Sequence, residues 1–444
     1  MKTVTDSDIL NLSMMTDYSS VHEIFNEYQA NRMNFENNEL EIKFLYECGS
    51  AFQEERHLVR QVIHPMTDDD YLSEYCYLLL QHKFELLNKQ KQAEIINVYL
   101  RSVTNLGANY ADAFRTSSAI QMFTKALKHD DHFDVAISGL LFAIDRHYTM
   151  FDYHGHAELF NYMFQLVQQF DTNRAKKVAA AELGSYFEGL KEHFENLKES
   201  FMKQSWYDPY AKFELMSKNN SFKYWSCRNT LFLNNLNDLG AFRQASFDID
   251  LSNLLSKEFL ESTVGGWLNS LIVSYQRSRK QVFILKQSRK ADIEGVQREF
   301  IWLYGFFDKA AYIINKYFKL GIKDEKVNFY SIWNSERIQQ IPNTFLHDLF
   351  WLQKEEKNHR YNGLISPDAI KMDLVRNIIE HRHIVSTTEN GEISYTKLIG
   401  VSIHLLLVIR HMLMSLVGTI YVEEQSSDIP EKKRLIKMSE FDLY

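Results

Sequence analysis

Residues 401–422 read VSIHLLLVIRHMLMSLVGTIYV, a stretch composed mainly of large apolar side chains. As a helix it is long enough to cross a membrane. However, His404, Arg410 and His411 interrupt it, and each of these side chains would be costly in hydrocarbon. Helices that are apolar on most sides are also found buried inside larger soluble proteins. The stretch therefore predicts the central helix of a helical bundle that makes no membrane contact.

Composition around this stretch also favours helices. The 444 residues include only 5 prolines and 16 glycines, against 31 phenylalanines and 24 tyrosines. Few helix breakers and many large apolar groups predict an all-α protein, and the length predicts two or three domains. Long helical patterns with short joins indicate a bundle in the C-terminal half, over about 262–288, 292–320, 343–356, 367–384 and 394–424.

The bulk charge and the cysteines restrict the function and the compartment. The formal net charge of −8 provides no global basic field, so nucleic acid would need a local basic patch. Three cysteines, far apart and odd in number, predict reduced thiols rather than a disulfide framework. The first residues, MKTVTDSDILNLSMM, lack the basic-then-apolar pattern of a signal peptide. We expect a cytoplasmic protein.

Residues 103–136 contain the clearest internal pattern, a tetratricopeptide-like helix pair. Six of its eight signature positions are filled in VTNLGANYADAFRTSSAIQMFTKALKHDDHFDVA, by Leu106, Gly107, Tyr110, Ala119, Phe123 and Ala126. The small residues allow the two helices to cross closely, and the aromatic residues fill the space between them. Val103 and Asp131 replace the usual tryptophan and proline.

This helix pair predicts a degenerate array of helical hairpins, from about residue 20 to 215, ahead of the bundle. Such arrays usually hold a peptide or another protein on a concave face; a scaffold that only packs on the second half is the alternative. The aromatic and asparagine-rich block near residue 221 indicates a junction. The expected domains are an N-terminal tail (1–20), a repeat region (21–220), a helical bundle (221–425) and a polar tail (426–444).

Residues 375–383, VRNIIEHRH, divide into two faces when placed on a helix. One face is apolar and carries Val375, Ile378 and Ile379, together with Leu374, which directly precedes the stretch. The opposite face is polar and carries Arg376, Asn377, Glu380, His381 and His383. Neighbours four residues apart meet on a helix, so Glu380 can hold the Arg376 guanidinium and Asn377 can orient the His381 imidazole.

This polar face suits metal-free cleavage of RNA. Histidine, with an ordinary pKa of about 6.5, can take a proton from a ribose 2′-hydroxyl or give one to the leaving oxygen. Arginine can stabilise the additional charge on the five-coordinate phosphate. Because Arg376 and His381 diverge on one helix, a second copy across a two-fold axis would help to close the site. By spacing alone, the same residues also fit an ordinary solvated face.

Arg376, Asn377 and His381 on a late helix of an all-α bundle resemble the signature of the HEPN superfamily (higher eukaryote and prokaryote nucleotide-binding domains). The likeness extends to residues 224–240, 306–322, 366–383 and 404–424, and to a branch that carries tetratricopeptide-like repeats ahead of the bundle. The resemblance implies a dimeric, metal-independent endoribonuclease that leaves 2′,3′-cyclic phosphate ends. Arg376 and His381 would be its catalytic pair, with Asn377 assisting. It also implies a bacterial stress or phage-defence role.

One departure from the family pattern concerns His383, which stands where many members have a tyrosine. We expect Glu380 and His383 to support the site, His383 either as a second proton carrier or as a phosphate contact. The alternative to an enzyme is a non-catalytic adaptor, in which the repeats bind a protein and the bundle is a dimerisation or nucleotide-binding module.

Residues 275–290, YQRSRKQVFILKQSRK, contain no acidic residue. As a helix they form a basic stripe that can follow an RNA backbone or serve as a solvated face; the basic residues are Arg277, Arg279, Lys280, Lys286, Arg289 and Lys290. Segment 129–132 falls in the turn after the expected second helix, where polar residues are usual, and segment 147–156 lacks a paired site with the spacing that zinc needs, so no metal is expected. No phosphate-binding or dinucleotide glycine motif is present, so no cofactor is expected.

Overall fold

The computed structural model describes residues 2–15, 17–59, 68–112, 115–151, 157–179, 183–218, 221–288, 290–357, 375–376, 379 and 394–426. Over these residues the chain is almost entirely helical, with one short two-stranded sheet. The predicted all-α fold class is therefore confirmed. The described part of the chain separates into two compact units. The first comprises Met1–Asp145 and Gln165–Phe194, and the second Arg146–Phe164, Glu195–His359 and Ser366–Tyr444.

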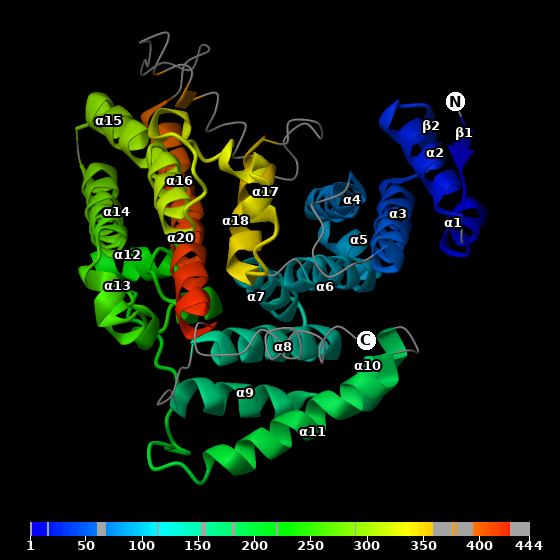
Figure 1. Cartoon of the computed structure of the whole chain (residues 1–444). Coiled ribbons are helices and arrows are strands. Elements are labelled where there is room, and N and C mark those ends of the chain that lie inside the picture. Colours follow the sequence, from blue (N-terminus) through cyan, green and yellow to red (C-terminus); the bar gives the residue numbers. More distant parts are fainter. Residues whose placement is uncertain are drawn as a thin grey trace. The chain divides into compact units, whose positions relative to one another are not determined.

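The first unit consists mainly of successive helices (Figure 1). Its elements are β1 (Lys2–Val4), α1 (Asp6–Ser13), α2 (Tyr18–Gln29), β2 (Met33–Phe35), α3 (Asn38–Val59), α4 (Asp68–Glu85), α5 (Lys89–Glu94), α6 (Ile96–Asp112), α7 (Thr116–Leu127) and α10 (Thr172–Val178). Three further helices, α8 (Asp134–Phe151), α9 (Ala157–Gln169) and α11 (Gly184–Phe201), contain the boundaries between the two units. The two units therefore meet within these three helices, whereas the boundary between the repeat region and the bundle was expected at residue 220.

Helices α6 and α7 form the helix pair expected between residues 103 and 136. Leu106, Tyr110, Ala119, Phe123 and Ala126 are all buried. A Cβ atom added at Gly107 would lie 2.8 Å from the Phe123 ring, so the small residue allows the close crossing. These contacts agree with the spacing from which the helix pair was predicted. That residues 21–220 form an array of tetratricopeptide-like repeats stays a prediction.

The first 20 residues, expected to form a tail, are folded over most of their length. Strand β1 pairs in parallel with β2, with Val4 opposite Phe35. Helix α1 begins with a capping box between Thr5 and Asp8, and its Ile9 side chain is buried. The apolar side of this short amphipathic helix needs cover, which is why the segment packs rather than frays.

The second unit contains the predicted helical bundle. Its further elements are α12 (Phe222–Arg228), η2 (Asn235–Leu239), η3 (Arg243–Ala245), η4 (Leu251–Asn253), α13 (Lys257–Glu261), α14 (Thr263–Gln287), α15 (Ile293–Tyr304), α16 (Phe306–Tyr317), η5 (Asp324–Lys326), η6 (Ile332–Asn334), α17 (Glu336–Gln339), α18 (Thr344–Lys357) and α20 (Tyr395–Ser426). Free, buried thiols are found at Cys48, Cys76 and Cys227, as the cysteine pattern predicted.

Helix α20 lies at the centre of this bundle, where α14, α15, α16 and α18 pack against it (Figure 1). By length and composition it could cross a membrane, but 78% of its most apolar window is buried inside the structure. Its neighbours thus supply the apolar surroundings that its side chains require. A Cβ atom added at Gly418 would lie 2.6 Å from the Phe345 ring, so α18 and α20 approach closely there.

Candidate active site

The described part of the 375–383 segment places Val375 and Ile379 toward the protein core, as the helical wheel predicted. Val375 is 2% exposed and belongs to the core cluster that includes α20. Ile379 is partly buried against the same cluster, and Arg376 is partly exposed. Val375 and Ile379 therefore anchor the described part of the segment in the core, while Arg376 lies outside the fully buried interior.

The other residues predicted for this site lie outside the described residues. They are Asn377, Glu380, His381 and His383. Their roles stay predictions from the sequence, and Arg376 is the member of the proposed catalytic pair whose surroundings are visible.

The Arg376 guanidinium lies over an aromatic ring. Its Cζ atom is 4.7 Å from the ring centroid of Tyr304, the last residue of α15. The Tyr304 hydroxyl is 3.3 Å from the hydroxyl of Tyr330, which follows α16 and η5 in the chain. Both tyrosines are partly exposed. A cation over a ring face within about 6 Å is attracted by the ring quadrupole, so the contact is favourable.

Buried phenylalanines hold these two tyrosines in place. Tyr304 packs edge-on against Phe307, with 5.7 Å between ring centroids. Phe307 contacts Phe329 at 5.3 Å, and Phe329 is next to Tyr330 in the chain. Phe307 and Phe329 are almost completely buried. The Tyr304 ring beneath Arg376 is thus partly exposed but packs against the buried core.

A second cation–aromatic contact lies near this site in the sequence. The Lys309 Nζ atom is 3.6 Å from the Trp302 ring centroid, and Trp302 is 50% exposed. Burial lowers the pKa of Lys309 below its ordinary value.

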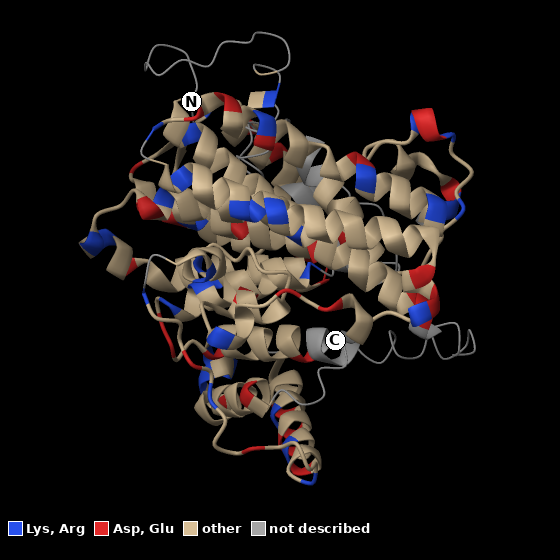
Figure 2. Cartoon of the chain, turned by 90° about the vertical axis from the view of Figure 1, so that its left-hand side faces the viewer, with Lys and Arg blue, Asp and Glu red and all other residues tan. Residues whose placement is uncertain are grey.

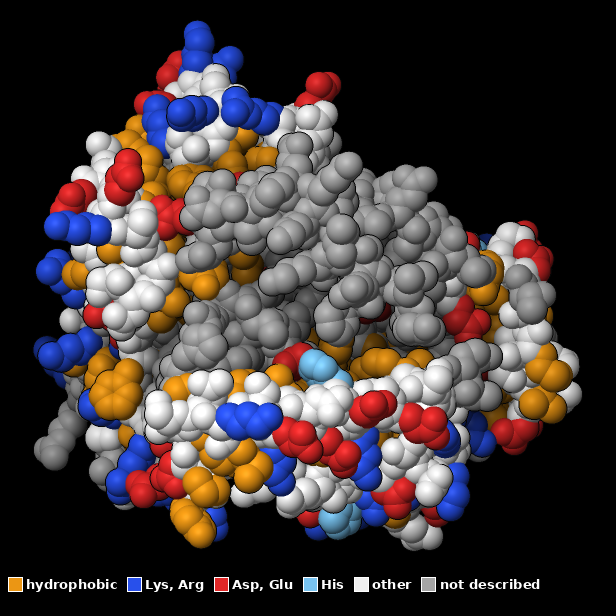
Figure 3. Space-filling view, turned by 60° about the horizontal axis from the view of Figure 1, so that its bottom comes forward, with side chains coloured by type: hydrophobic (Ala, Val, Ile, Leu, Met, Phe, Trp, Pro, Cys, Tyr) orange, Lys and Arg blue, Asp and Glu red, His pale blue; other side chains and the backbone are white. Residues whose placement is uncertain are grey.

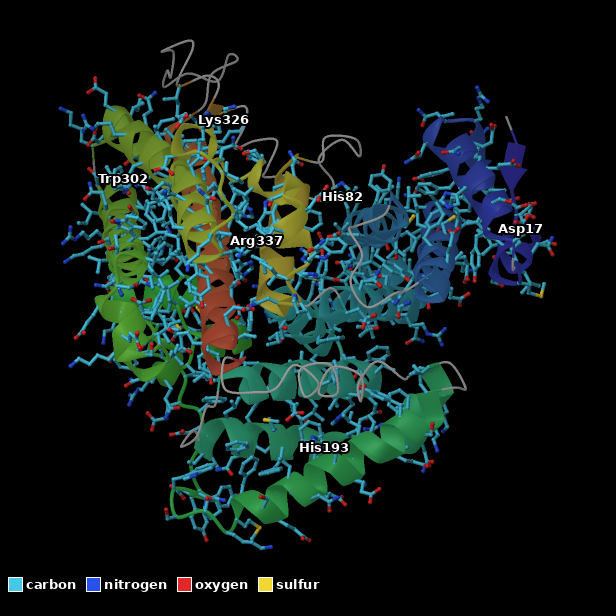
Figure 4. The ribbon with its side chains drawn as sticks, viewed as in Figure 1. Asp17, His82, His193, Trp302, Lys326 and Arg337 are labelled. Atoms are coloured by element: carbon cyan, nitrogen blue, oxygen red, sulfur yellow. The ribbon has the colours of Figure 1, made fainter. Side chains whose placement is uncertain are left out.

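Figure 4 labels Trp302, Lys326 and Arg337, which come from successive segments of the second unit. The aromatic run that contains Trp302 and Tyr304 was visible in the sequence, but nothing there paired it with Arg376.

The predicted basic stripe is split by the structure. Arg277, Lys280, Lys286 and Lys290 are exposed, whereas Arg289 lies outside the described residues. Arg279 is 3% exposed, and its guanidinium donates to both carboxylate oxygens of Asp248 at 2.7–2.8 Å and to the Leu231 carbonyl. The expectation that Arg279 faces RNA is therefore wrong, because its side chain is buried in the bundle and its two terminal nitrogens donate to Asp248 and Leu231.

Charges of both signs are distributed over the described helices. Figure 2 shows Lys and Arg positions interspersed with Asp and Glu along the helices. On the face drawn in Figure 3, basic, acidic and apolar side chains are mixed over most of the coloured surface. The described residues of this face thus form no large single-sign patch, and nucleic acid would be attracted there only by a local basic group.

A cavity of about 420 Å³ lies between η4 and α14 and does not include Arg376 or Tyr304. The two carboxylates that line this cavity already have partners within the fold. Asp248 forms an ion pair with Arg279, and Asp250 accepts a hydrogen bond from the Ser252 backbone N–H. Among the described residues, no group of three or more His, Cys, Asp or Glu side chains is placed to hold a metal ion. The arginine–tyrosine cluster is thus the stronger candidate for chemistry.

The fold and this cluster define an all-α bundle in which the partly exposed Arg376 lies over the ring of Tyr304. Residues 281–423 match the model of the LA2681-like HEPN family. The match supports a C-terminal HEPN domain and covers Tyr304, Tyr330 and Arg376. No curated protein and no solved structure matches the chain.

Proposed function

We propose that the chain is a metal-independent endoribonuclease whose active site is in the C-terminal HEPN domain. The observation that carries this proposal is the match of residues 281–423 to a HEPN family, in a range that contains Arg376, Asn377 and His381. The partial exposure of Arg376 supports it, since a catalytic arginine has to be accessible to RNA. The proposed substrate is RNA, and no metal or cofactor takes part.

In the proposed reaction, a ribose 2′-oxygen attacks the adjacent phosphorus and the bond to the 5′-oxygen breaks. His381 takes the 2′-hydroxyl proton or gives a proton to the leaving oxygen. Arg376 stabilises the additional negative charge of the five-coordinate phosphate. The products are a 2′,3′-cyclic phosphate and a 5′-hydroxyl. Asn377 assists His381, while Glu380 and His383 support the site.

A homodimer formed through the HEPN domain completes this proposal. Arg376 and His381 diverge on one helix, so a second copy brings another histidine to the same phosphate. The helical first unit would bind a protein or peptide partner and control cleavage. In this scheme the protein acts in the cytoplasm during bacterial stress or phage defence and halts growth by cutting cellular RNA.

The test uses purified full-length protein, RNA and EDTA. Wild-type protein should cleave RNA in EDTA and leave cyclic phosphate ends, whereas Arg376→Ala and His381→Ala should lose cleavage by several orders of magnitude. Arg337→Ala is the matched control, because Arg337 is an exposed arginine of the same unit that donates to the Lys319 carbonyl. It should cleave like wild type. Persistent cleavage by both site variants, or loss of cleavage in EDTA, would contradict the proposal.

The adaptor function remains the second candidate, and the helix pair α6–α7 favours it. Its Gly107–Phe123 crossing matches the geometry of repeats that commonly bind other proteins. An adaptor would cause no growth arrest on overexpression in bacteria, and the wild type and His381→Ala would then behave alike. Arrest by the wild type only would favour the enzyme.

A further inference from the structure

We infer that Tyr304 is a positioning residue for Arg376, and that Tyr330 and the phenylalanines beneath it fix Tyr304 in turn. The inference deepens the proposed function and rests on it for its catalytic consequence. Its basis is the 4.7 Å contact between the Arg376 Cζ atom and the Tyr304 ring centroid. The motif around Arg376 does not reveal this contact, since Tyr304 stands 72 positions earlier in the chain.

The contact places a flexible cation on a rigid surface. Arginine has a long side chain, and holding it in one geometry costs conformational entropy. An aromatic face attracts the guanidinium through its quadrupole and can stack with its plane, a contact that Arg makes more readily than Lys. An aromatic face carries no formal charge, so the contact with the Tyr304 ring leaves the positive charge on Arg376.

The Tyr304 ring is held from two sides. Its hydroxyl is 3.3 Å from that of Tyr330, and its ring packs against Phe307 and Phe300. Phe300 and Phe307 are buried. Because packing fixes the ring, the guanidinium that lies over it is held in one position. A catalytic group has to be held in its productive geometry in this way. An arginine displaced by about 1 Å can cost on the order of a hundredfold in rate.

Gly305 marks the junction of α15 and α16 at which this ring lies. It stands between α15 and α16 with φ −68° and ψ −5°, so the chain turns there with nearly helical geometry. Tyr304 ends α15, and Phe306 and Phe307 begin α16 in the core. At this junction Tyr304 is partly exposed, whereas Phe306 and Phe307, which follow it, are buried. Tyr304 therefore lies between the core and the accessible surface.

The test compares Tyr304→Phe and Tyr304→Leu in the full-length protein. Tyr304→Leu removes the ring and should lower kcat for RNA by roughly threefold to thirtyfold, the range expected of a cation–π contact. Tyr304→Phe keeps the ring and should stay within about threefold of wild type, as the weaker cation–π energy of Phe implies. Tyr312→Leu is the matched control. Its ring contacts Lys316 and Trp267, and it should leave kcat unchanged.

A double-mutant cycle separates positioning from a general loss of structure. Binding of a non-cleavable 2′-O-methyl RNA is measured for wild type, Tyr304→Leu, Arg376→Ala and the double variant, with thermal unfolding followed for each. If Tyr304 acts through Arg376, its loss should have no further effect on binding once Arg376 is absent. A merely structural role would give additive losses that follow the unfolding temperature.

The outcomes distinguish this inference from the proposed function. Wild-type cleavage that Tyr304→Leu leaves unchanged overturns the inference and leaves the function intact. No wild-type cleavage, with binding losses that are coupled between Tyr304 and Arg376, overturns the nuclease and supports the positioning role at an anion-binding site. Additive binding losses overturn the positioning role. Absence of both cleavage and RNA binding overturns both.

Discussion

Arg410 and Asp238 form an ion pair in which both side chains are completely buried, 172 residues apart in the chain. The Arg410 guanidinium donates to both Asp238 oxygens, at 2.9 and 3.1 Å, and to two backbone carbonyls, of Phe232 and Asn234. Charge, donors and acceptors are thus matched inside the bundle. The pair joins the centre of α20 to the loop that contains η2, so the helix and the loop depend on each other.

Asp238→Asn should therefore lower the free energy of unfolding by about 3–5 kcal/mol, because it leaves a buried guanidinium without its counter-charge. Urea unfolding measures the change. Glu214→Gln is the matched control, since the Glu214–Arg243 pair is more than 60% exposed on both sides and should contribute at most about 1 kcal/mol. Equal stabilities for the two variants would show that the Arg410–Asp238 pair does not stabilise the fold.

Neighbouring basic residues of α14 should behave differently from one another. Arg279→Ala should lower the free energy of unfolding by about 3–5 kcal/mol, because Asp248 would be left without its buried partner. Arg277→Ala and Lys280→Ala are exposed changes that should stay within about 0.5 kcal/mol of wild type.

If the exposed basic residues bind RNA, Arg277→Ala and Lys280→Ala should each weaken binding. Each should also reduce the slope of log affinity against log salt by about 0.7, the value for one phosphate contact on a single strand. The measurement is RNA binding across a salt series, with urea unfolding as the control for folding. An unchanged slope in both variants would remove these residues from the interface.

Adjacent glycines at the start of α14 should respond in opposite directions to alanine. A Cβ atom at Gly265 would lie 2.1 Å from the Phe259 carbonyl oxygen and 2.8 Å from the Leu260 Cα atom. Because these are backbone atoms, Gly265→Ala should destabilise the fold by about 1–3 kcal/mol. At Gly266 nothing lies within 4 Å, so Gly266→Ala should stabilise it by up to about 1 kcal/mol. Thermal unfolding would show the opposite shifts, and a shared sign would contradict the close α13–α14 approach.

Glu299 on α15 should make stability depend on pH. Burial raises the pKa of its carboxyl above the ordinary 4.5, against a smaller lowering by a hydrogen bond from Ser278. The folded state then binds this proton more tightly than the unfolded state, so its contribution to stability falls as pH rises through that range. Glu299→Gln should be more stable than wild type at pH 7, and the difference should shrink toward pH 4.

The control for this prediction is Glu294→Gln, an exposed change in the first turn of the same helix. It should slightly destabilise at pH 7, because a negative charge is favourable at a helix N-terminus. Urea unfolding at several pH values follows both variants. A Glu299→Gln protein that is less stable than wild type at pH 7 would show that the ionised carboxylate is not penalised.

Much of the secondary structure followed from local patterns. Few glycines and prolines predicted an all-α chain, and the apolar stretch 401–422 predicted the buried central helix α20. The spacing of Gly107 and Phe123 predicted a closely crossed helix pair, and Val375 and Ile379 lie on the core side as the wheel indicated. Periodicity worked in these places because it reports which side of a helix is apolar, and burial follows the apolar side.

The sequence by itself thus determined the helices, the apolar faces and the candidate motif that contains Arg376. Tertiary structure decided the partners. Arg279, expected to contact RNA, is a buried partner of Asp248. Strand β1, in the expected N-terminal tail, pairs with β2, and Tyr304 lies beneath Arg376. The physical reason is that a charged side chain has the same local pattern whether it faces water or a distant opposite charge. Only chain packing supplies that distant group.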